Sequence, residues 1–150
     1  MSVVIGWREW FVLPDLGVKQ IKAKIDTGAR SSAIHAINLE YDERDGVPWV
    51  KFQIHPEQRN SRKTVTSEAR VIDHRVVTSS GGHRTKRPVI ATTFTALGQS
   101  WDAEVTLASR DTMGFRMLIG REAIRGRFVV DPGRSFLGGK RKRKKKTSKK

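Results

Sequence analysis

A strand-like alternation that ends in a small polar turn constrains this chain more than any other feature. Residues 21–25 alternate apolar and basic side chains, with Ile21, Ala23 and Ile25 at every second position. In an extended strand such residues point to one face, and the intervening lysines point to the other. The next residue, Asp26, is therefore expected at the end of a half-buried strand.

Asp26 opens the tripeptide Asp26-Thr27-Gly28, which offers a carboxylate, a hydroxyl and a glycine in succession. Glycine has no Cβ, so another chain can approach its backbone closely, and a carboxylate beside it can act as a general acid or base. The tripeptide is therefore compatible with the site of an aspartic peptidase. It is also the composition of a turn that an aspartate closes by a hydrogen bond to the backbone. The tripeptide alone leaves both interpretations open.

The second informative segment is an apolar run, residues 117–119, that is followed by Gly120 and Arg121. A short helix is expected after this run, ending near Gly126, because glycine commonly terminates helices. Together the two segments resemble the retropepsins, the single-domain aspartic peptidases. More closely, the chain resembles the RimB-type family through Asp26 to Ala36, Ser79 to Gly82, Arg87 to Val89, Arg110, Met113, Leu118 to Arg121 and Gly126 to Asp131. The resemblance covers most of residues 3–137.

Turn signals divide the rest of the chain into short strands. Strands are expected at Val3 to Leu13, Ile37 to Tyr41, Val47 to Ile54, Thr64 to Val77, Pro88 to Leu97, Trp101 to Ala108 and Arg127 to Val130. Many short strands with a single helix candidate predict an all-β chain. The resemblance narrows this to a small retropepsin-like acid-protease barrel with one short helix. Trp7 and Trp10 are better explained by core packing than by stacking on nucleic-acid bases.

The glycine-rich segment from Ser79 to Lys86 is expected to be the tip of a hairpin, because strand-prone sequence flanks it on both sides. Gly81 and Gly82 would give the tip freedom to open. In retropepsins the hairpin at this place in the chain is the flap that closes over substrate. The resemblance therefore implies substrate contacts from Gly81, Gly82, His83 and Arg87. Without the resemblance, an ordinary surface hairpin is the simpler interpretation.

A single Asp-Thr-Gly per chain determines the expected oligomeric state. Aspartic peptidases activate water between two facing carboxylates that share one proton, so the resemblance implies a homodimer with one Asp26 from each chain. As in retropepsins, Thr27 would hold the two loops together, and Gly28 would line the substrate groove beside Ala29. Ala29 lacks the hydroxyl that pepsin-like relatives have here, which favours a pH optimum nearer neutrality.

Arginines stand where viral retropepsins have an ion pair. Those enzymes carry an acidic residue directly after Asp-Thr-Gly-Ala, whereas this chain has Arg30, which cannot pair with Arg121. One or both side chains are then expected to face the groove or to find another acid, such as Glu122. Because arginine binds carboxylates through two hydrogen bonds, we expect a preference for acidic side chains. The alternative is that Arg30 only satisfies local carbonyl groups.

RimB-type proteins are associated with a ligase that adds α-linked glutamates to a ribosomal protein. The resemblance therefore implies a retropepsin-like aspartic endopeptidase or glutamate-trimming peptidase that acts on such acidic tails. Members are also often labelled ATP-dependent zinc proteases, but here His35, His55, His74 and His83 are scattered and form no His-Glu-x-x-His motif. The sequence also contains no Gly-x-x-x-x-Gly-Lys-Ser/Thr phosphate loop. We expect neither a metal nor another cofactor.

The C-terminal residues form a basic tail. The net charge is +15, and nine Lys or Arg residues without an acid lie between Lys140 and Lys150. We expect residues 139–150 to be a disordered tail behind a peptidase domain of residues 1–138, because such a segment repels itself and buries no apolar surface. The tail could dock on ribosomal RNA, on an acidic protein or on anionic lipid, or it could only aid solubility. The alternative to an enzyme is a non-catalytic retropepsin-like module that binds the ribosome or RNA through this tail.

Composition excludes several other classes of function. The chain has no Cys, which excludes disulfides, thiolate catalysis and cysteine-bound zinc. Arg8 and Glu9 interrupt the N-terminal apolar stretch, and no apolar run approaches the roughly eighteen residues of a membrane helix. We expect a soluble, cytoplasmic protein with no membrane partner.

Overall fold

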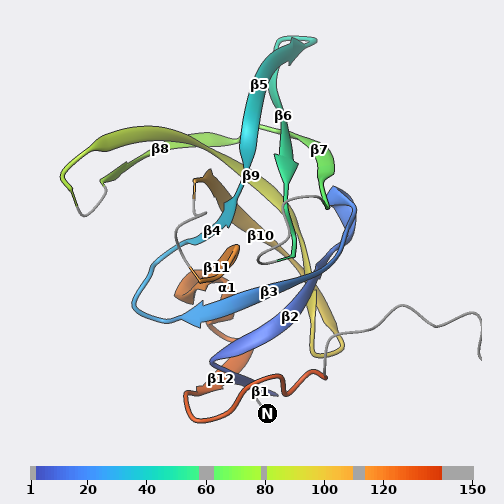
Figure 1. Ribbon diagram of the computed structural model, residues 1–150, viewed down its shortest axis with the longest axis vertical. Coiled ribbons are helices and arrows are strands. Elements are labelled where there is room, and N and C mark those ends of the chain that lie inside the picture. Colours follow the sequence, from blue (N-terminus) through green and yellow to red (C-terminus); the bar gives the residue numbers. More distant parts are fainter. Residues whose placement is uncertain (1–2, 58–62, 79–80, 110–113, 140–150) are drawn as a thin grey trace, which may run out of the picture.

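The computed structural model describes residues 3–57, 63–78, 81–109 and 114–139, which are built mainly from β-strands (Figure 1). The strands are β1 (Val3–Gly6), β2 (Arg8–Leu13), β3 (Val18–Asp26), β4 (Ser32–His35), β5 (Ile37–Arg44), β6 (Val47–Ile54), β7 (Val65–Arg70), β8 (Asp73–Thr78), β9 (Arg84–Ala96), β10 (Gln99–Ala108), β11 (Met117–Gly120) and β12 (Phe128–Asp131). Within the described residues, one 3-10 helix, η1 (Pro14–Leu16), joins β2 to β3, and one α-helix, α1 (Arg121–Ile124), follows β11.

Six of these strands close into a barrel. In sheet order β10, β4, β11, β3, β2 and β9 are hydrogen bonded in succession, and β9 also pairs with β10. The predicted alternation of β3 is confirmed, because Ile21, Ala23 and Ile25 are all buried. They pack in one core with large side chains of other strands, including Phe11 and Phe94. The predicted all-β, retropepsin-like barrel with one short helix is therefore confirmed.

The stretch predicted as one strand from Thr64 to Val77 is wrong, because it forms two strands in different sheets. β7 pairs with β6 in a three-stranded sheet with β5, whereas β8 pairs with β9 beside the barrel. Between them the N–H of Val71 bonds to Pro48 in one sheet, and the N–H of Ile72 bonds to Val89 in the other. β-Branched residues suit either sheet, so the composition contained no signal for this change of partner.

The first predicted strand, Val3 to Leu13, is also divided, because the chain leaves one partner and joins another at Trp7. β1 runs parallel to β12, and β2 runs antiparallel to β3. The N–H of Trp7 bonds to the carbonyl of Arg134, and the ring packs edge-on against Phe115 at 5.9 Å between centroids. Trp10 stacks on Phe136 at 5.8 Å, so both tryptophans lie in half-buried aromatic contacts.

Arg44 forms ion pairs with two acids on the surface of the three-stranded sheet. This sheet projects from the barrel at the top of Figure 1. The Arg44 guanidinium lies 2.7 Å from Glu68 and 3.3 Å from Asp42. The hydrogen bond from Arg44 lowers the pKa of Glu68. The backbone N–H of Glu43, and then Arg44, lower the pKa of Asp42.

Glu9 is a buried carboxylate that the sequence analysis did not recognise as structural. It is 0% exposed and accepts the backbone N–H groups of Gly6, Leu137 and Gly138 at 2.8 to 3.0 Å. Glu9, Phe11 and Leu13 are every second residue of β2 and share its buried face. This spacing was a signal in the sequence. Glu9 therefore ties the C-terminal segment to the start of the barrel.

We expect Glu9→Gln to lower the free energy of unfolding by about 2 kcal/mol, because an amide NH₂ cannot accept and a buried N–H loses its acceptor. Urea denaturation would measure the change. The control is Glu40→Gln, an exposed position on β5, which should stay within about 0.5 kcal/mol of the unmodified chain. Equal stability of the two variants would contradict this role for Glu9.

The predicted tail, residues 139–150, lies outside the described residues apart from Gly139, so its disorder and the boundary at residue 138 stay predictions. Within the described part of the chain, no helix combines the length and apolar character needed to span a membrane.

Candidate active site

The loop between β3 and β4 carries Asp26 where β3 ends. Its carboxylate oxygen Oδ1 accepts the N–H of Gly28 at 3.0 Å, and its main-chain carbonyl accepts the N–H of Ala29 at 3.1 Å. The aspartate-closed turn considered as an alternative is therefore present. It engages only Oδ1, because Oδ2 accepts no hydrogen bond from any residue that the structure describes. The turn therefore leaves one carboxylate oxygen of Asp26 available for chemistry. Asp26 is half-buried, while Thr27 and Gly28 are exposed.

β11 supports this loop from behind. It is inserted between β3 and β4, parallel to the first with Gly120 opposite Asp26, and antiparallel to the second. The N–H of Gly120 donates to the hydroxyl of Ser32 at 3.0 Å. A Cβ at Gly120 would lie 2.5 Å from the carbonyl carbon of Ser31, so the loop can approach β11 this closely only at a glycine.

The first N–H groups of α1 also bond to the loop. Those of Arg121 and Glu122 donate to the carbonyls of Ala29 at 2.8 Å and Arg30 at 3.2 Å. The initial N–H groups of a helix have no partner within the helix, so these two bonds satisfy both sides. The Asp26 loop is thus held at its strand end, at β11 and at α1.

The two arginines predicted to bind substrate differ in their surroundings. The Arg121 guanidinium nitrogen Nη1 lies 3.5 Å from the carbonyl of Thr27 and 3.4 Å from that of Gly28. The sequence had suggested, as an alternative, that Arg30 only satisfies local carbonyl groups. In the structure Arg121 makes such contacts. The Arg30 side chain is exposed and makes no hydrogen bond or ion pair within the described residues. Glu122 pairs with Arg125 at 3.4 Å.

The predicted flap is the β8–β9 hairpin, which extends from the barrel on the same side as the Asp26 loop in Figure 1. Its regular pairing reaches Thr78 opposite Arg84, so the expected tip from Ser79 to Lys86 is shorter and ends at His83. Ser79 and Ser80 lie outside the described residues, and Gly81, Gly82 and His83 are exposed. Arg87 is half-buried opposite Arg75, within the strands rather than at the tip.

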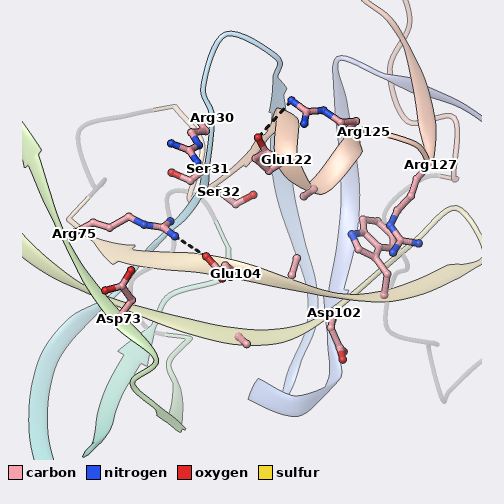
Figure 2. Close-up of a pocket in the computed structure, with 14 residues that line it drawn as sticks. Arg30, Ser31, Ser32, Asp73, Arg75, Asp102, Glu104, Glu122, Arg125 and Arg127 are labelled. Atoms are coloured by element: carbon pink, nitrogen blue, oxygen red, sulfur yellow. Dashed lines mark hydrogen bonds and ion pairs between the residues drawn. The ribbon is translucent and has the colours of Figure 1, made fainter.

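A groove of about 840 Å³ begins at the Asp26 loop and had not been anticipated (Figure 2). Four arginines and four acids line it, together with small residues and Trp101. Its lining residues are Arg30, Ser31, Ser32, Asp73, Arg75, Ala91, Trp101, Asp102, Ala103, Glu104, Glu122, Ala123, Arg125 and Arg127. These residues come from separate parts of the chain, so no local motif could have indicated the groove.

The histidines are spread over the fold. His35 is buried in β4, His74 lies on β8, and His55 contacts Lys63 and Thr64. Within the described residues there is no group of three or more His, Cys, Asp or Glu side chains that could hold a metal ion.

Comparisons with known proteins cover nearly the whole chain. The family described as RimB-like, "Retropepsin-like aspartic endopeptidase RimB", matches residues 4–141. A probable alpha-L-glutamate ligase from Shewanella pealeana is 46% identical over 92% of this chain, and one from Desulfotalea psychrophila is 45% identical over 86%. The chain spans only 30% and 28% of the lengths of these two relatives. The crystal structure of a Legionella pneumophila protein of unknown function is similar with a TM-score of 0.76 and 25% identity, over 92% of this chain and 99% of that one.

Proposed function

Because this chain belongs to the RimB-like family of retropepsin-like aspartic endopeptidases, we propose that it hydrolyses peptide bonds with a water molecule activated between two Asp26 carboxylates of a homodimer. The carrying observation is the Asp26 loop itself. A carboxylate at the end of β3 has one oxygen bonded to Gly28, and the loop is supported by β11 and α1. Such preorganisation suits general acid–base catalysis, which needs the carboxylate held in one place.

The chemistry requires a second carboxylate. One Asp26 would be ionised and take a proton from water, while the partner's Asp26, protonated, would polarise the scissile carbonyl. The pair would then protonate the leaving amine. Exposure of Thr27 and Gly28 supports the proposal, because a second copy could approach the loop at these residues.

We propose acidic peptides, and α-linked glutamate tails of a ribosomal protein in particular, as the substrate. The curated relatives are named for glutamate ligation, and this chain matches less than a third of their length. This chain contains no Gly-x-x-x-x-Gly-Lys-Ser/Thr loop, and we propose that it cleaves glutamate polymers rather than ligating glutamate. A glutamate-adding part and a peptidase part in one chain would share a glutamate polymer as their common substrate. Arg30 belongs to the same loop as Asp26, and its side chain has no acid partner in the described residues, so it could bind carboxylate side chains.

The test is hydrolysis of α-linked octaglutamate and of octaglutamine, which matches it in length and shape but is neutral. We expect kcat/KM to be at least about tenfold higher for octaglutamate, because one charge-assisted hydrogen bond contributes about 1.5–3 kcal/mol. A chelator should leave the rate unchanged. Faster cleavage of octaglutamine, or loss of activity with the chelator, would contradict the proposed substrate or mechanism.

The basic tail supports a second candidate function, contact with ribosomal RNA. Removing residues 140–150 deletes nine positive charges, so we expect affinity for RNA to fall at least about tenfold and to depend less on salt. Filter binding at two salt concentrations would measure both effects. Hydrolysis of octaglutamate by the shortened chain should stay within about twofold of the full chain if the barrel is the enzyme. Loss of hydrolysis together with RNA binding would instead favour the non-catalytic module.

A further inference from the structure

The groove beside the Asp26 loop is lined by four arginines and four acids, but not every arginine has an acid partner. Glu104 pairs with Arg75 at 2.6 Å, and Glu122 pairs with Arg125 at 3.4 Å. Asp73 accepts the N–H of His74 at 2.8 Å, and the Thr93 hydroxyl is shared between Asp102 at 3.0 Å and Asp15 at 2.9 Å. By contrast, the guanidinium groups of Arg30 and Arg127 make no hydrogen bond or ion pair within the described residues. Two guanidinium groups therefore remain available.

We propose that this groove is an extended subsite for acidic peptides, in which Arg30 and Arg127 bind two carboxylate side chains of the same substrate. The proposal rests on the peptidase function proposed above and identifies Arg127 as a specificity-determining residue. The groove has one arginine at each end of this subsite. Arg30 belongs to the Asp26 loop, and Arg127 follows α1. Figure 2 shows Arg30 and Arg127 on opposite sides of the groove, with Ser32 and Glu122 between them.

Trp101 makes the Arg127 end of the groove suitable for a carboxylate. The Arg127 guanidinium lies over the Trp101 ring at 5.3 Å from its centroid. Stacking on an aromatic face orients a guanidinium and leaves the N–H groups at its edge for a planar, bidentate acceptor. Trp101 is only 6% exposed, and its indole N–H has no acceptor among the described residues. The buried ring is therefore a fixed surface on which the Arg127 guanidinium lies.

The geometry of an extended peptide agrees with two separated cations. Alternate side chains of a strand point to the same side, about 7 Å apart, so a run of glutamates presents a row of carboxylates to one wall. Its backbone N–H groups can donate to the lone pairs that remain on Glu104 and Glu122. An RNA strand brings a phosphate at every nucleotide, and its 2′-hydroxyls do not repeat with the spacing of peptide N–H groups. The spacing of donors and carboxylates along an extended peptide is therefore the reason that we favour an acidic peptide over RNA.

Binding can be separated from hydrolysis by measuring it with full-length Asp26→Asn protein. Fluorescence anisotropy would give the Kd of labelled α-octaglutamate for this protein and for the same protein with Arg30→Gln or Arg127→Gln added. We expect each added change to weaken binding about tenfold, as one lost charge-assisted contact should. Arg127→Lys should lose less, because the charge stays. Arg70→Gln, an exposed position on β7 outside the groove, makes the same charge change and should have no effect.

A change of the opposite sign excludes simple damage to the fold. The Glu122–Arg125 pair is largely exposed and therefore contributes little stability. Glu122→Gln releases Arg125 into the groove and removes one negative charge, so we expect octaglutamate to bind about threefold tighter. A partly unfolded protein would not bind its ligand more tightly.

The outcomes separate this inference from the proposed function. If Arg30→Gln and Arg127→Gln bind octaglutamate like Arg70→Gln, or if octaglutamine binds equally well, the subsite is overturned even when the unmodified protein hydrolyses peptides. If binding changes as expected but the unmodified protein cleaves neither peptide, the subsite stands and the peptidase proposal fails. If unlabelled single-stranded RNA displaces octaglutamate and loses affinity with Arg127→Gln, the groove binds nucleic acid and the peptide assignment is wrong.

Discussion

Asp26→Asn is expected to lower kcat for octaglutamate hydrolysis by roughly a thousandfold, the scale of a lost general acid–base group. The asparagine amide oxygen can still accept the N–H of Gly28, which Oδ1 accepts at 3.0 Å, so the turn should persist. The amide cannot take a proton from water, however, and two amides cannot share a proton. Initial rates would measure the loss of activity, and thermal unfolding should show a nearly unchanged midpoint.

Mixing the two proteins provides the control for shared catalysis. If each site needs Asp26 from both subunits, equal amounts of unmodified and Asp26→Asn protein, after subunit exchange, should retain only about half of the activity of the unmodified input, because random pairing makes mixed dimers. A chain that works alone would keep all of it. Full activity of the Asp26→Asn protein by itself would show that Asp26 has only the turn-closing role.

Local patterns in the sequence were sufficient for the parts of the fold that depend on neighbouring residues. The alternation at residues 21–25 predicted both the strand and its buried face, and Gly126 indicated the end of a short helix. Each of these features is determined by side-chain direction or backbone freedom within a few residues. The barrel as a whole depended on the resemblance, since strand order is a long-range property that composition does not contain.

The failures of prediction are all long-range. Residues 64–77 contain no turn signal, yet the chain changes sheets between Arg70 and Asp73 because Pro48 and Val89 supply different carbonyl partners. The alternation of β2 indicated a buried position for Glu9, but the N–H groups of Leu137 and Gly138 that satisfy its carboxylate come from the far end of the chain. A local pattern can thus indicate that a charge is buried without identifying its partners.

The candidate site shows the same division between local and long-range features. Asp26 and Gly28 could be identified from the tripeptide Asp26-Thr27-Gly28. The distinct surroundings of Arg30 and Arg121 could not, because Arg121 reaches back to Thr27 and Gly28 from a segment far along the chain. Arg127 was read only as the start of a strand, and its position over Trp101 in the groove depends on tertiary structure.

Gly120→Ala is expected to reduce both stability and activity, because the loop that carries Asp26 lies against Gly120. The backbone of Gly120 is extended, with φ of −85° and ψ of 169°, so alanine could adopt its conformation. The obstacle is space. An added Cβ would lie 2.5 Å from the carbonyl carbon of Ser31 and 2.8 Å from the carbonyl oxygen of Arg30, both of them backbone atoms that must move. We expect a loss of about 3 kcal/mol in the free energy of unfolding, at the upper end for overpacking.

The same displacement should act on catalysis, because the Gly120 strand position is paired with Asp26 and its N–H holds Ser32. We expect kcat to fall about a hundredfold in the folded fraction, since misplacing a catalytic group by about 1 Å has this effect. Gly133→Ala is the matched control: its Cβ would lie 3.5 Å from the nearest atom, a carboxylate oxygen of Asp131, which is ordinary contact. Urea denaturation of both variants would measure the free energy of unfolding, and initial rates would measure kcat. If Gly120→Ala were as stable and active as Gly133→Ala, the close support of the Asp26 loop by β11 could not be what positions the carboxylate.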